Sequence, residues 1–310
     1  MVTKILFENR RAVGVEFNFR GRRHRVNATR EVIISAGGIN TAQLLMISGI
    51  GPMSELDRLR IPLVADLPVG QNLQEHPAGF VAFELDESVH WFILLEYLYW
   101  LFLSNNSTGE AMDLPDHELY FLELPAIYAK LRVGFTPEIL HPKSRGTVRL
   151  RTTNPYDFPD IDPNYMDDPQ DVKDIVEGMK NCIKILTAPP MAKVGAKMFN
   201  TTFPECTRFW DNLDLFLVCN ARAALMSVSH PVGTAKMGQA HDPSTVVDPE
   251  LSTCALYFTR VKTITGLRVI DSSVMPTIIW GNTNIPTIMI AEKGADMIKS
   301  TITCDPSTFG

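Results

Sequence analysis

The segment SHPVGTAKMG, residues 229–238, places a histidine directly before a Pro-x-Gly turn. An imidazole titrates near neutral pH, so His230 is a candidate proton acceptor in catalysis. Histidines beside such turns are also common structural residues, and this segment alone leaves both interpretations open. Features elsewhere in the chain distinguish them.

Several familiar catalytic and binding motifs are absent from the sequence. There is no G-x-G-x-x-G turn, no P-loop, no G-x-S-x-G elbow and no H-E-x-x-H zinc motif. Neither a C-x-x-C pair nor a cysteine with a histidine at ligand spacing occurs, so we expect no metal site. The five cysteines are irregularly spaced and leave the redox compartment open: Cys182, Cys206, Cys219, Cys254 and Cys304.

The composition is that of a soluble globular protein of one large or two ordinary domains. The 310 residues carry a net charge of −6 and are 45% hydrophobic, which argues against a nucleic-acid partner. The most basic stretch, RGRRHR at 20–25, predicts a solvated hairpin face, with a phosphate or heparin patch as the weaker alternative.

No segment predicts a transmembrane helix. The apolar run at 91–103 has 13 positions and contains Glu96, so we expect a buried or amphipathic helix there, with a membrane-surface role as the alternative. The first 17 residues lack the long apolar stretch of a secretory signal. Four glycosylation-type triplets, at Asn27, Asn105, Asn106 and Asn200, are compatible with secretion without establishing it.

The chain opens with a strand-rich region followed by a βα unit. Apolar alternation predicts strands at 4–8, 12–19 and 24–35, the last ending in the small residues SAGG. Residues 40–51 have helical spacing, with Asn40 or Thr41 as the N-cap and Gly49 at the end. A strand, a small-residue turn and a helix in this order are typical of an α/β sheet.

The βα rhythm stops at residue 78 and returns after residue 217. Between them the sequence predicts strands at 118–124 and 145–152 and a helix at 168–186. A strand running into a turn at 266–276 and a helix at 284–300, with Pro286 in its first turn, follow. We therefore expect residues 1–78 and 218–302 to form one α/β domain, interrupted by a second domain at 79–217, with a tail at 303–310.

Separated stretches of the chain resemble one enzyme family. They include REVIISAGGINTAQLLMISGIGP, VGQNLQEHP, HPVGTAKMG, GLRVIDSSVMP and GNTNIPTIMIAEKGADMIK, in the family's order. The chain thus resembles the C-terminal portion of the glucose-methanol-choline (GMC) oxidoreductases, most closely the arthropod glucose dehydrogenases and the choline dehydrogenases. The resemblance implies a mixed α/β fold in which a partial, Rossmann-like FAD-binding domain is interrupted by a substrate domain with an antiparallel sheet and helices.

The resemblance also implies a reaction. Family members use FAD to take a hydride from an alcohol or sugar carbon, and a quinone or oxygen then accepts the electrons. His230 matches the histidine that accepts the hydroxyl proton, and Asn284 matches a position held by a histidine or an asparagine beside the flavin. A neutral imidazole can accept that proton, while the amide of Asn284 can bond the developing alkoxide without competing for it. A loop-capping role is the alternative for Asn284.

Cofactor contacts follow from the same resemblance. Val2 matches a residue whose backbone meets the adenine, and Asp271 and Ser272 match positions facing the pyrophosphate and ribityl chain. Asn284, Ile285 and Pro286 match the segment along the flavin ring. An ordinary turn or cap role is the alternative for Asp271. His76 matches a linker turn of the family, and four histidines match no catalytic position: His90, His117, His141 and His241.

The sequence departs from the family pattern at its start, because the family's G-x-G-x-x-G turn would precede residue 1. We therefore do not expect this stretch alone to hold FAD tightly. The alternatives are a catalytically inactive fragment or decayed paralogue that at most binds a ligand, and, within the family, a hydroxynitrile lyase. Secretion is plausible from the resemblance, and the substrate cannot be read from the sequence.

Overall fold

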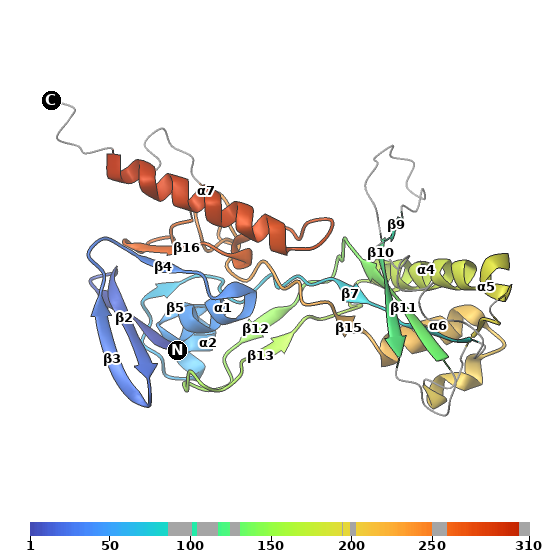
Figure 1. Cartoon of the computed structure of the whole chain (residues 1–310). Helices are drawn as coiled ribbons and strands as arrows, with labels where there is room; N and C mark the ends of the chain where they lie inside the picture. The colour runs from blue at the N-terminus through green and yellow to red at the C-terminus, as the bar shows by residue number, and fades with distance from the viewer. Residues whose placement is uncertain are drawn as a thin grey trace.

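A computed structural model describes most of the chain as two packed parts joined by a narrow region (Figure 1). One part contains the N-terminal strands and the last helix, and the other contains most of the middle of the chain. Short strands connect the two parts. The described residues are 1–85, 101–103, 117–124, 131–193, 195–198, 203–249 and 259–303.

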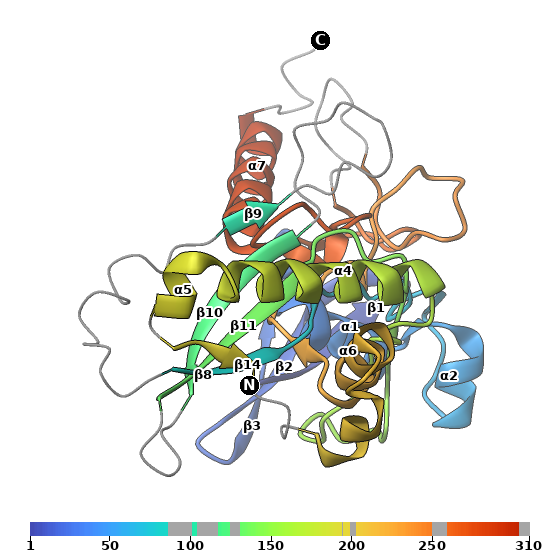
Figure 2. The same cartoon turned by 90° about the vertical axis from the view of Figure 1, so that its right-hand side faces the viewer.

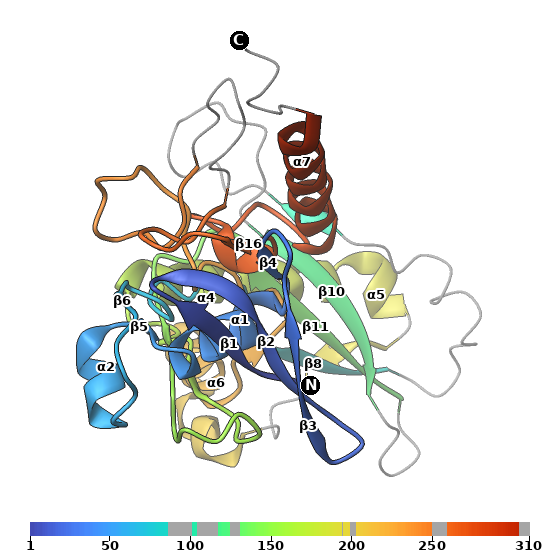
Figure 3. The same cartoon turned by 90° about the vertical axis from the view of Figure 1, so that its left-hand side faces the viewer.

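An antiparallel sheet of three strands opens the chain, as the apolar alternation predicts. It consists of β1 (Val2–Glu8), β2 (Arg11–Phe19) and β3 (Arg22–Asn27), in that order. Every residue of β3 is exposed, and the turn before it has positive φ at Arg20 and Gly21. The prediction of a solvated hairpin at 20–25 is therefore confirmed (Figure 3).

The strand predicted at 24–35 is two strands, so that prediction is wrong as made. β3 ends at Asn27, and β4 (Val32–Ile34) begins after a bend. β4 pairs in parallel with β16 (Leu267–Val269), whereas β3 pairs with β2. The chain must turn between β3 and β4 because these strands belong to different sheets. The local sequence pattern does not show which sheet a strand joins.

The helix after β4 is α1 (Gly37–Ile47), so the expected βα unit is confirmed with a different cap. The helix begins three residues before Asn40, and the side chain of its N-cap residue, Ala36, makes no capping bond. Instead, Asp271 accepts hydrogen bonds from Gly37 N (2.9 Å) and Thr41 Oγ1 (2.6 Å). Neither Asn40 nor Thr41 is the N-cap because this distant carboxylate satisfies the helix start. Gly49, with φ of 95°, closes the helix as predicted.

Short elements complete the first apolar core: β5 (Ile50–Gly51), α2 (Met53–Arg58), β6 (Ala65–Asp66), β12 (Thr147–Arg149) and β13 (Asp160–Asp162). This core packs α1 against β1, β4 and β16. It also contains Val148 and Leu150, which lie inside the range expected for the second domain. The predicted domain boundaries remain a prediction.

The second part is built on an antiparallel sheet, which Figure 2 shows with α4 across it. Its main path is β14-β8-β11-β10-β9, and β7 joins β11 to β15. The last residues of the predicted helix at 91–103 form β9, so that part of the prediction is wrong, and 91–100 lie outside the described residues. The strands are β7 (Pro77–Ala78), β8 (Val81–Leu85), β9 (Leu101–Leu103), β10 (His117–Leu124), β11 (Leu131–Ile139), β14 (Lys197–Met198) and β15 (Met226–Ser227).

Helices cover this sheet and form the second apolar core with it. α4 (Pro169–Leu186) starts as predicted, with Asp168 capping it by accepting from Gln170 N at 2.8 Å. A disulfide joins Cys206 to Cys219, linking η2 to α6. The remaining elements are α5 (Pro189–Lys193), η2 (Pro204–Phe209) and α6 (Leu213–Ala223).

The chain returns to the first part through η3 (Ser272–Val274) and α7 (Asn284–Thr303). α7 confirms the predicted helix with Pro286 in its first turn, and it lies above β16 and β4 (Figure 1). Its first turns expose Ile285, Ile288 and Met289. No helix within the described residues, α7 included, has the length and apolar character needed to cross a membrane. The mixed α and β architecture matches the expectation.

Candidate active site

The candidate base lies where the two parts of the molecule meet. β15 pairs with β7, matching Ser227 with Pro77, and β11 pairs with β7, matching Glu138 with Ala78. His76 directly precedes β7, and His230 follows β15 by three residues. Strand pairing therefore brings together three segments that are far apart in the sequence (Figure 1).

Two imidazoles share one carboxylate oxygen in this region. Glu138 Oε1 lies 2.7 Å from His76 Nδ1 and 3.2 Å from His230 Nδ1, and the two Nδ1 atoms are 3.1 Å apart. The rings meet edge to face, with centroids 5.2 Å apart. The side chains of His76 and Glu138 are fully buried, whereas that of His230 retains 11% of its exposure. We call these three residues the histidine–glutamate cluster.

Glu75 fixes the main chain around both histidines. Its Oε1 accepts from His76 N (3.0 Å) and His230 N (2.8 Å), and its Oε2 accepts from His230 N (3.0 Å) and Ser227 Oγ (3.0 Å). These bonds hold the chain at Ser229, whose φ of 67° is unusual for a residue with a side chain. One buried carboxylate therefore determines where the backbone of His230 lies.

Glycines allow the turn after His230 to pack tightly. Gly233 has φ of 87°, and a Cβ on Gly38 at the start of α1 would lie 2.3 Å from the carbonyl oxygen of Pro231. Thr234 Oγ1 also donates to the Gly38 carbonyl. The Pro-x-Gly-Thr pattern after His230 is thus explained by close contact between this turn and α1.

Gln74 and His76 attach the loop that leads to α7. The backbone of Gln74 exchanges two hydrogen bonds with Val232 (3.1 and 2.9 Å), and its side chain bonds Pro276 O and Ile278 N (both 3.1 Å). His76 Nε2 lies 3.1 Å from the carbonyl oxygen of Ile279. The segment 74–76 therefore holds both the turn of His230 and the loop at 276–279.

The surroundings of the cluster raise the pKa of His230 and lower that of Glu138. Burial alone would lower the pKa of His230, but the hydrogen bond to Glu138 and the charges of Glu138, Glu75 and Glu118 outweigh it, so the pKa is raised. Burial would raise the pKa of Glu138, yet its hydrogen bonds from His230 and His76 lower it overall. The pKa of Glu75 is raised because burial outweighs its hydrogen bonds.

The other predicted catalytic residue lies apart from the cluster. Asn284 is the first residue of α7 and its side chain is exposed. Among the described residues no hydrogen bond joins it to His230. Ile285 and Pro286 follow in the same turn, with Ile285 69% exposed. The roles assigned to Asn284, Ile285 and Pro286 therefore stay predictions.

The predicted cofactor contacts at the end of β16 are engaged within the protein. Both carboxylate oxygens of Asp271 accept bonds, from Gly37 and Thr41 at one oxygen and from Ser273 at the other. This arrangement fits the alternative that Asp271 is a cap residue, and its cofactor contact stays a prediction. Ser272 Oγ donates to Pro231 O at 3.1 Å and is partly buried.

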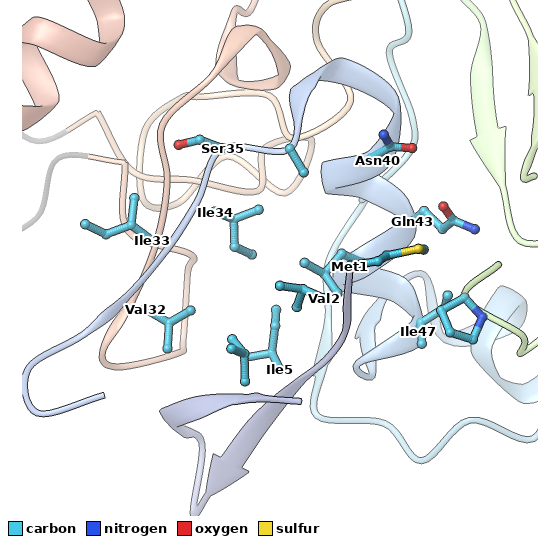
Figure 4. Close-up of a pocket in the computed structure, with 14 residues that line it drawn as sticks. Met1, Val2, Ile5, Val32, Ile33, Ile34, Ser35, Asn40, Gln43 and Ile47 are labelled. Atoms are coloured by element: carbon cyan, nitrogen blue, oxygen red, sulfur yellow. The ribbon is translucent and has the colours of Figure 1, made fainter. Parts of the chain in front are cut away.

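Val2 borders an apolar groove of about 400 Å³ (Figure 4). The start of β1, the length of β4 and the exposed side of α1 form its walls. Ser35, Asn40 and Gln43 supply polar atoms at one side, and Ile33 on β4 is 46% exposed. Val2 therefore lies at the rim of an open site, as the predicted adenine contact requires, although the contact itself is untested.

Sequence reasoning missed the residues that hold His230. His76 looks like a linker turn in the sequence, and the signal of Glu138 was a charged residue within the mainly apolar stretch GFTPEIL, which the structure shows to be buried. The cluster atoms lie within 4.8 Å of one another, a set that could hold a cation. The two separations to Glu138 Oε1, 2.7 and 3.2 Å, are hydrogen-bond lengths, and we assign these two as hydrogen bonds.

Comparison with known proteins identifies the surroundings of this site. Two family models described as GMC oxidoreductase match residues 1–78 and 142–291, which together are more than half of the chain. The chain is 35% identical to a glucose dehydrogenase [FAD, quinone] of Drosophila pseudoobscura pseudoobscura, over 96% of the chain and 52% of the relative. It is 38% identical to an alcohol dehydrogenase [acceptor] of Pseudomonas putida, over 96% of the chain and 56% of the relative.

Solved structures agree on the fold. The crystal structure of pyridoxine 4-oxidase from Mesorbium loti matches with a TM-score of 0.77 and 25% identity, over 95% of this chain and 56% of that chain. The chain spans about half the length of the curated relatives it matches. The predicted resemblance and the predicted mixed α/β fold are both confirmed.

Proposed function

Because this chain belongs to the GMC oxidoreductase family, we propose that it carries the proton-accepting site of an FAD-dependent oxidoreductase acting on the CH–OH group of a small alcohol or sugar. The observation that carries the proposal is His230, which is held by buried carboxylates while its side chain keeps 11% of its exposure. Relatives named glucose dehydrogenase and alcohol dehydrogenase support the substrate class.

The ring of His230 has one nitrogen available for chemistry. Within the described residues its hydrogen bonds are both at Nδ1, to Glu138 and to His76. The side chain keeps 11% of its exposure, and we assign this opening to the edge that carries Nε2. A neutral ring can accept the substrate hydroxyl proton there, and Glu138 stabilises the imidazolium that results.

FAD, when bound, supplies the hydride acceptor. The groove beside Val2 fits one part of such a group, because a flat, apolar site of about 400 Å³ with a few polar atoms suits a heteroaromatic ring. The exposed start of α7 fits another. Its helix N-terminus favours negative charge, and the amide of Asn284 is free to bond the substrate oxygen. Ser272 lies at the start of η3.

The electron acceptor in this proposal is a quinone or oxygen, as the resemblance implies. One relative carries quinone in its name, which supports the first of the two. Both oxygens of the Asp271 carboxylate accept bonds within the protein, and the cofactor contact of Asp271 stays a prediction.

The experiment is an absorbance measurement on the purified chain, alone and after addition of FAD. Bound flavin gives bands near ~370 and ~450 nm, and an alcohol or sugar that is oxidised bleaches the second band. We expect His230→Ala to slow bleaching ~10²–10⁴-fold with the bands retained. The exposed His241→Ala is the matched control and should bleach at the rate of the unmodified chain.

Two outcomes contradict different parts of the proposal. Bleaching of His230→Ala at the unmodified rate would remove the base assignment. Absorbance bands of added FAD that are the same with and without the chain would instead remove the cofactor assignment.

A further inference from the structure

The ring of His76 is held between two acceptors. Its Nε2 lies 3.1 Å from the carbonyl oxygen of Ile279, which can only accept a hydrogen bond, so Nε2 carries a proton. Its Nδ1 lies 2.7 Å from Glu138 Oε1, a short separation typical of a charge-assisted bond. A ring that donates at both nitrogens is an imidazolium.

Glu138 needs such a partner because it has no access to water. Its side chain is fully buried, and among the described residues Oε2 has no hydrogen-bond partner. The hydrogen bonds that stabilise the charge of Glu138 are therefore all made by Oε1. An isolated buried carboxylate is strongly unfavourable, whereas one paired with an imidazolium is tolerated.

The same oxygen determines the proton position on His230. His230 Nδ1 faces Glu138 Oε1 at 3.2 Å and His76 Nδ1 at 3.1 Å. If His76 Nδ1 carries a proton, the facing nitrogen of His230 can donate to the carboxylate. When the neutral ring of His230 carries its proton on Nδ1, Nε2 keeps its lone pair, and a proton acceptor requires that lone pair.

We propose that Glu138 and His76 form a buried carboxylate–imidazolium pair that holds His230 as the Nδ1–H tautomer, with Nε2 free to accept a proton. Glu138 and His76 are then positioning residues, and only His230 touches the substrate. The proposal rests on the proposed function for the use of Nε2, but the tautomer is a property of the chain itself. The charged groups that face His230 are His76, Glu138, Glu75 and Glu118.

The competing arrangement predicts the opposite tautomer. In it, His76 Nδ1–H is shared between Glu138 and His230, so that His230 Nδ1 accepts and its Nε2 carries the proton. Nε2 could then not accept a substrate proton. The two arrangements differ at one atom, which makes them separable by measurement.

The test is a long-range ¹H–¹⁵N correlation spectrum of the chain with ¹⁵N-labelled histidine, recorded at neutral pH without cofactor. His230→Gln and His76→Gln assign the two rings among the seven histidines. We expect His230 to be protonated at Nδ1 only, and His76 at both nitrogens. A His230 ring protonated at Nε2 only, or a neutral His76, would overturn the proposal, and this measurement needs no substitution at Glu138.

A second measurement follows the titration of His230. Glu138→Gln removes the charge but keeps the size, so the titration midpoint should fall by at least ~1 pH unit, a tenfold loss of proton affinity. The exposed Glu205→Gln of η2 removes the same charge elsewhere and should leave the midpoint unchanged. An unchanged midpoint in a folded Glu138→Gln chain also overturns the proposal. Flavin bleaching decides the proposed function separately, because neither spectrum here involves the cofactor.

Discussion

Glu75 offers the sharpest test of how the backbone of His230 is held. Its carboxylate accepts from two buried backbone N–H groups, those of His76 and His230, and from Ser227 Oγ. In Glu75→Ala both N–H groups lose their acceptor, at ~1–3 kcal/mol each, so unfolding free energy should fall by about 2–6 kcal/mol. In Glu75→Gln the amide oxygen can keep both N–H bonds while its NH₂ donates to the serine hydroxyl, and the loss should be about 1 kcal/mol.

The pH dependence of this difference has a definite sign. The pKa of Glu75 is raised by burial above the ordinary 4.5, so the folded chain binds the proton more tightly than the unfolded chain does. Its contribution to stability is therefore fullest below pH 4.5 and decreases as pH rises through the folded pKa. Glu75→Gln lacks this titration, so its cost should be larger at pH 4.5 than at pH 7.

Denaturant unfolding at pH 4.5 and pH 7 measures the unfolding free energy of the unmodified chain and of both Glu75 variants. Glu205→Gln is the exposed control. Two results would refute the reasoning. One is an alanine variant no less stable than the glutamine variant, which would mean that the N–H bonds are not the main contribution. The other is a glutamine cost that grows with rising pH, which would mean that burial does not dominate the pKa of Glu75.

Three further predictions concern packing and the cysteines. Gly38→Ala should lower unfolding free energy by ~1–3 kcal/mol, because its Cβ would meet the carbonyl oxygen of Pro231, and denaturant titration checks this. Reducing the disulfide between Cys206 and Cys219 should cost about 3 kcal/mol for a loop of this size, measured with and without dithiothreitol. The buried thiol of Cys182, whose pKa burial raises to about 12, should not react with a thiol reagent at pH 8 until the chain unfolds.

Elements with strong local signals were predictable from the sequence. α4 starts after Asp168 because an aspartate followed by proline both caps the helix and favours its first turn. α7 was predictable in the same way, because Pro286 lies in its first turn, where proline is favoured. These signals depend only on residues close in the sequence, and the structure agrees with them.

Features that depend on distant partners were not predictable. The bend between β3 and β4 exists because β4 pairs with β16, more than 230 residues later. The start of α1 is satisfied by Asp271 rather than by Asn40 or Thr41. In each case the local sequence pattern is compatible with the prediction, but a contact with a residue distant in the sequence determines a different structure.

The histidine–glutamate cluster shows the same limit at the site itself. His230 was identified as the candidate base, but nothing near it in sequence indicates Glu138, which lies 92 residues away and meets it through the pairing of β11 with β7. A lone glutamate in an apolar strand is a signal only when its partners are known. Buried charges are tolerated in pairs, so an unexplained one in a strand is reason to look for a histidine or a cation nearby.

The position of His230 also explains why the site needs both parts of the molecule. Its turn packs on Gly38 at the start of α1, in the first core, while its ring bonds Glu138 on β11, in the sheet of the second. Neither contact alone fixes the ring, because the turn determines where the backbone lies and, in our proposal, the carboxylate determines which nitrogen carries the proton. The proposed proton-accepting state of His230 therefore depends on the two parts packing in one arrangement, with Glu75 and the paired strands β7 and β15 as the connection between them.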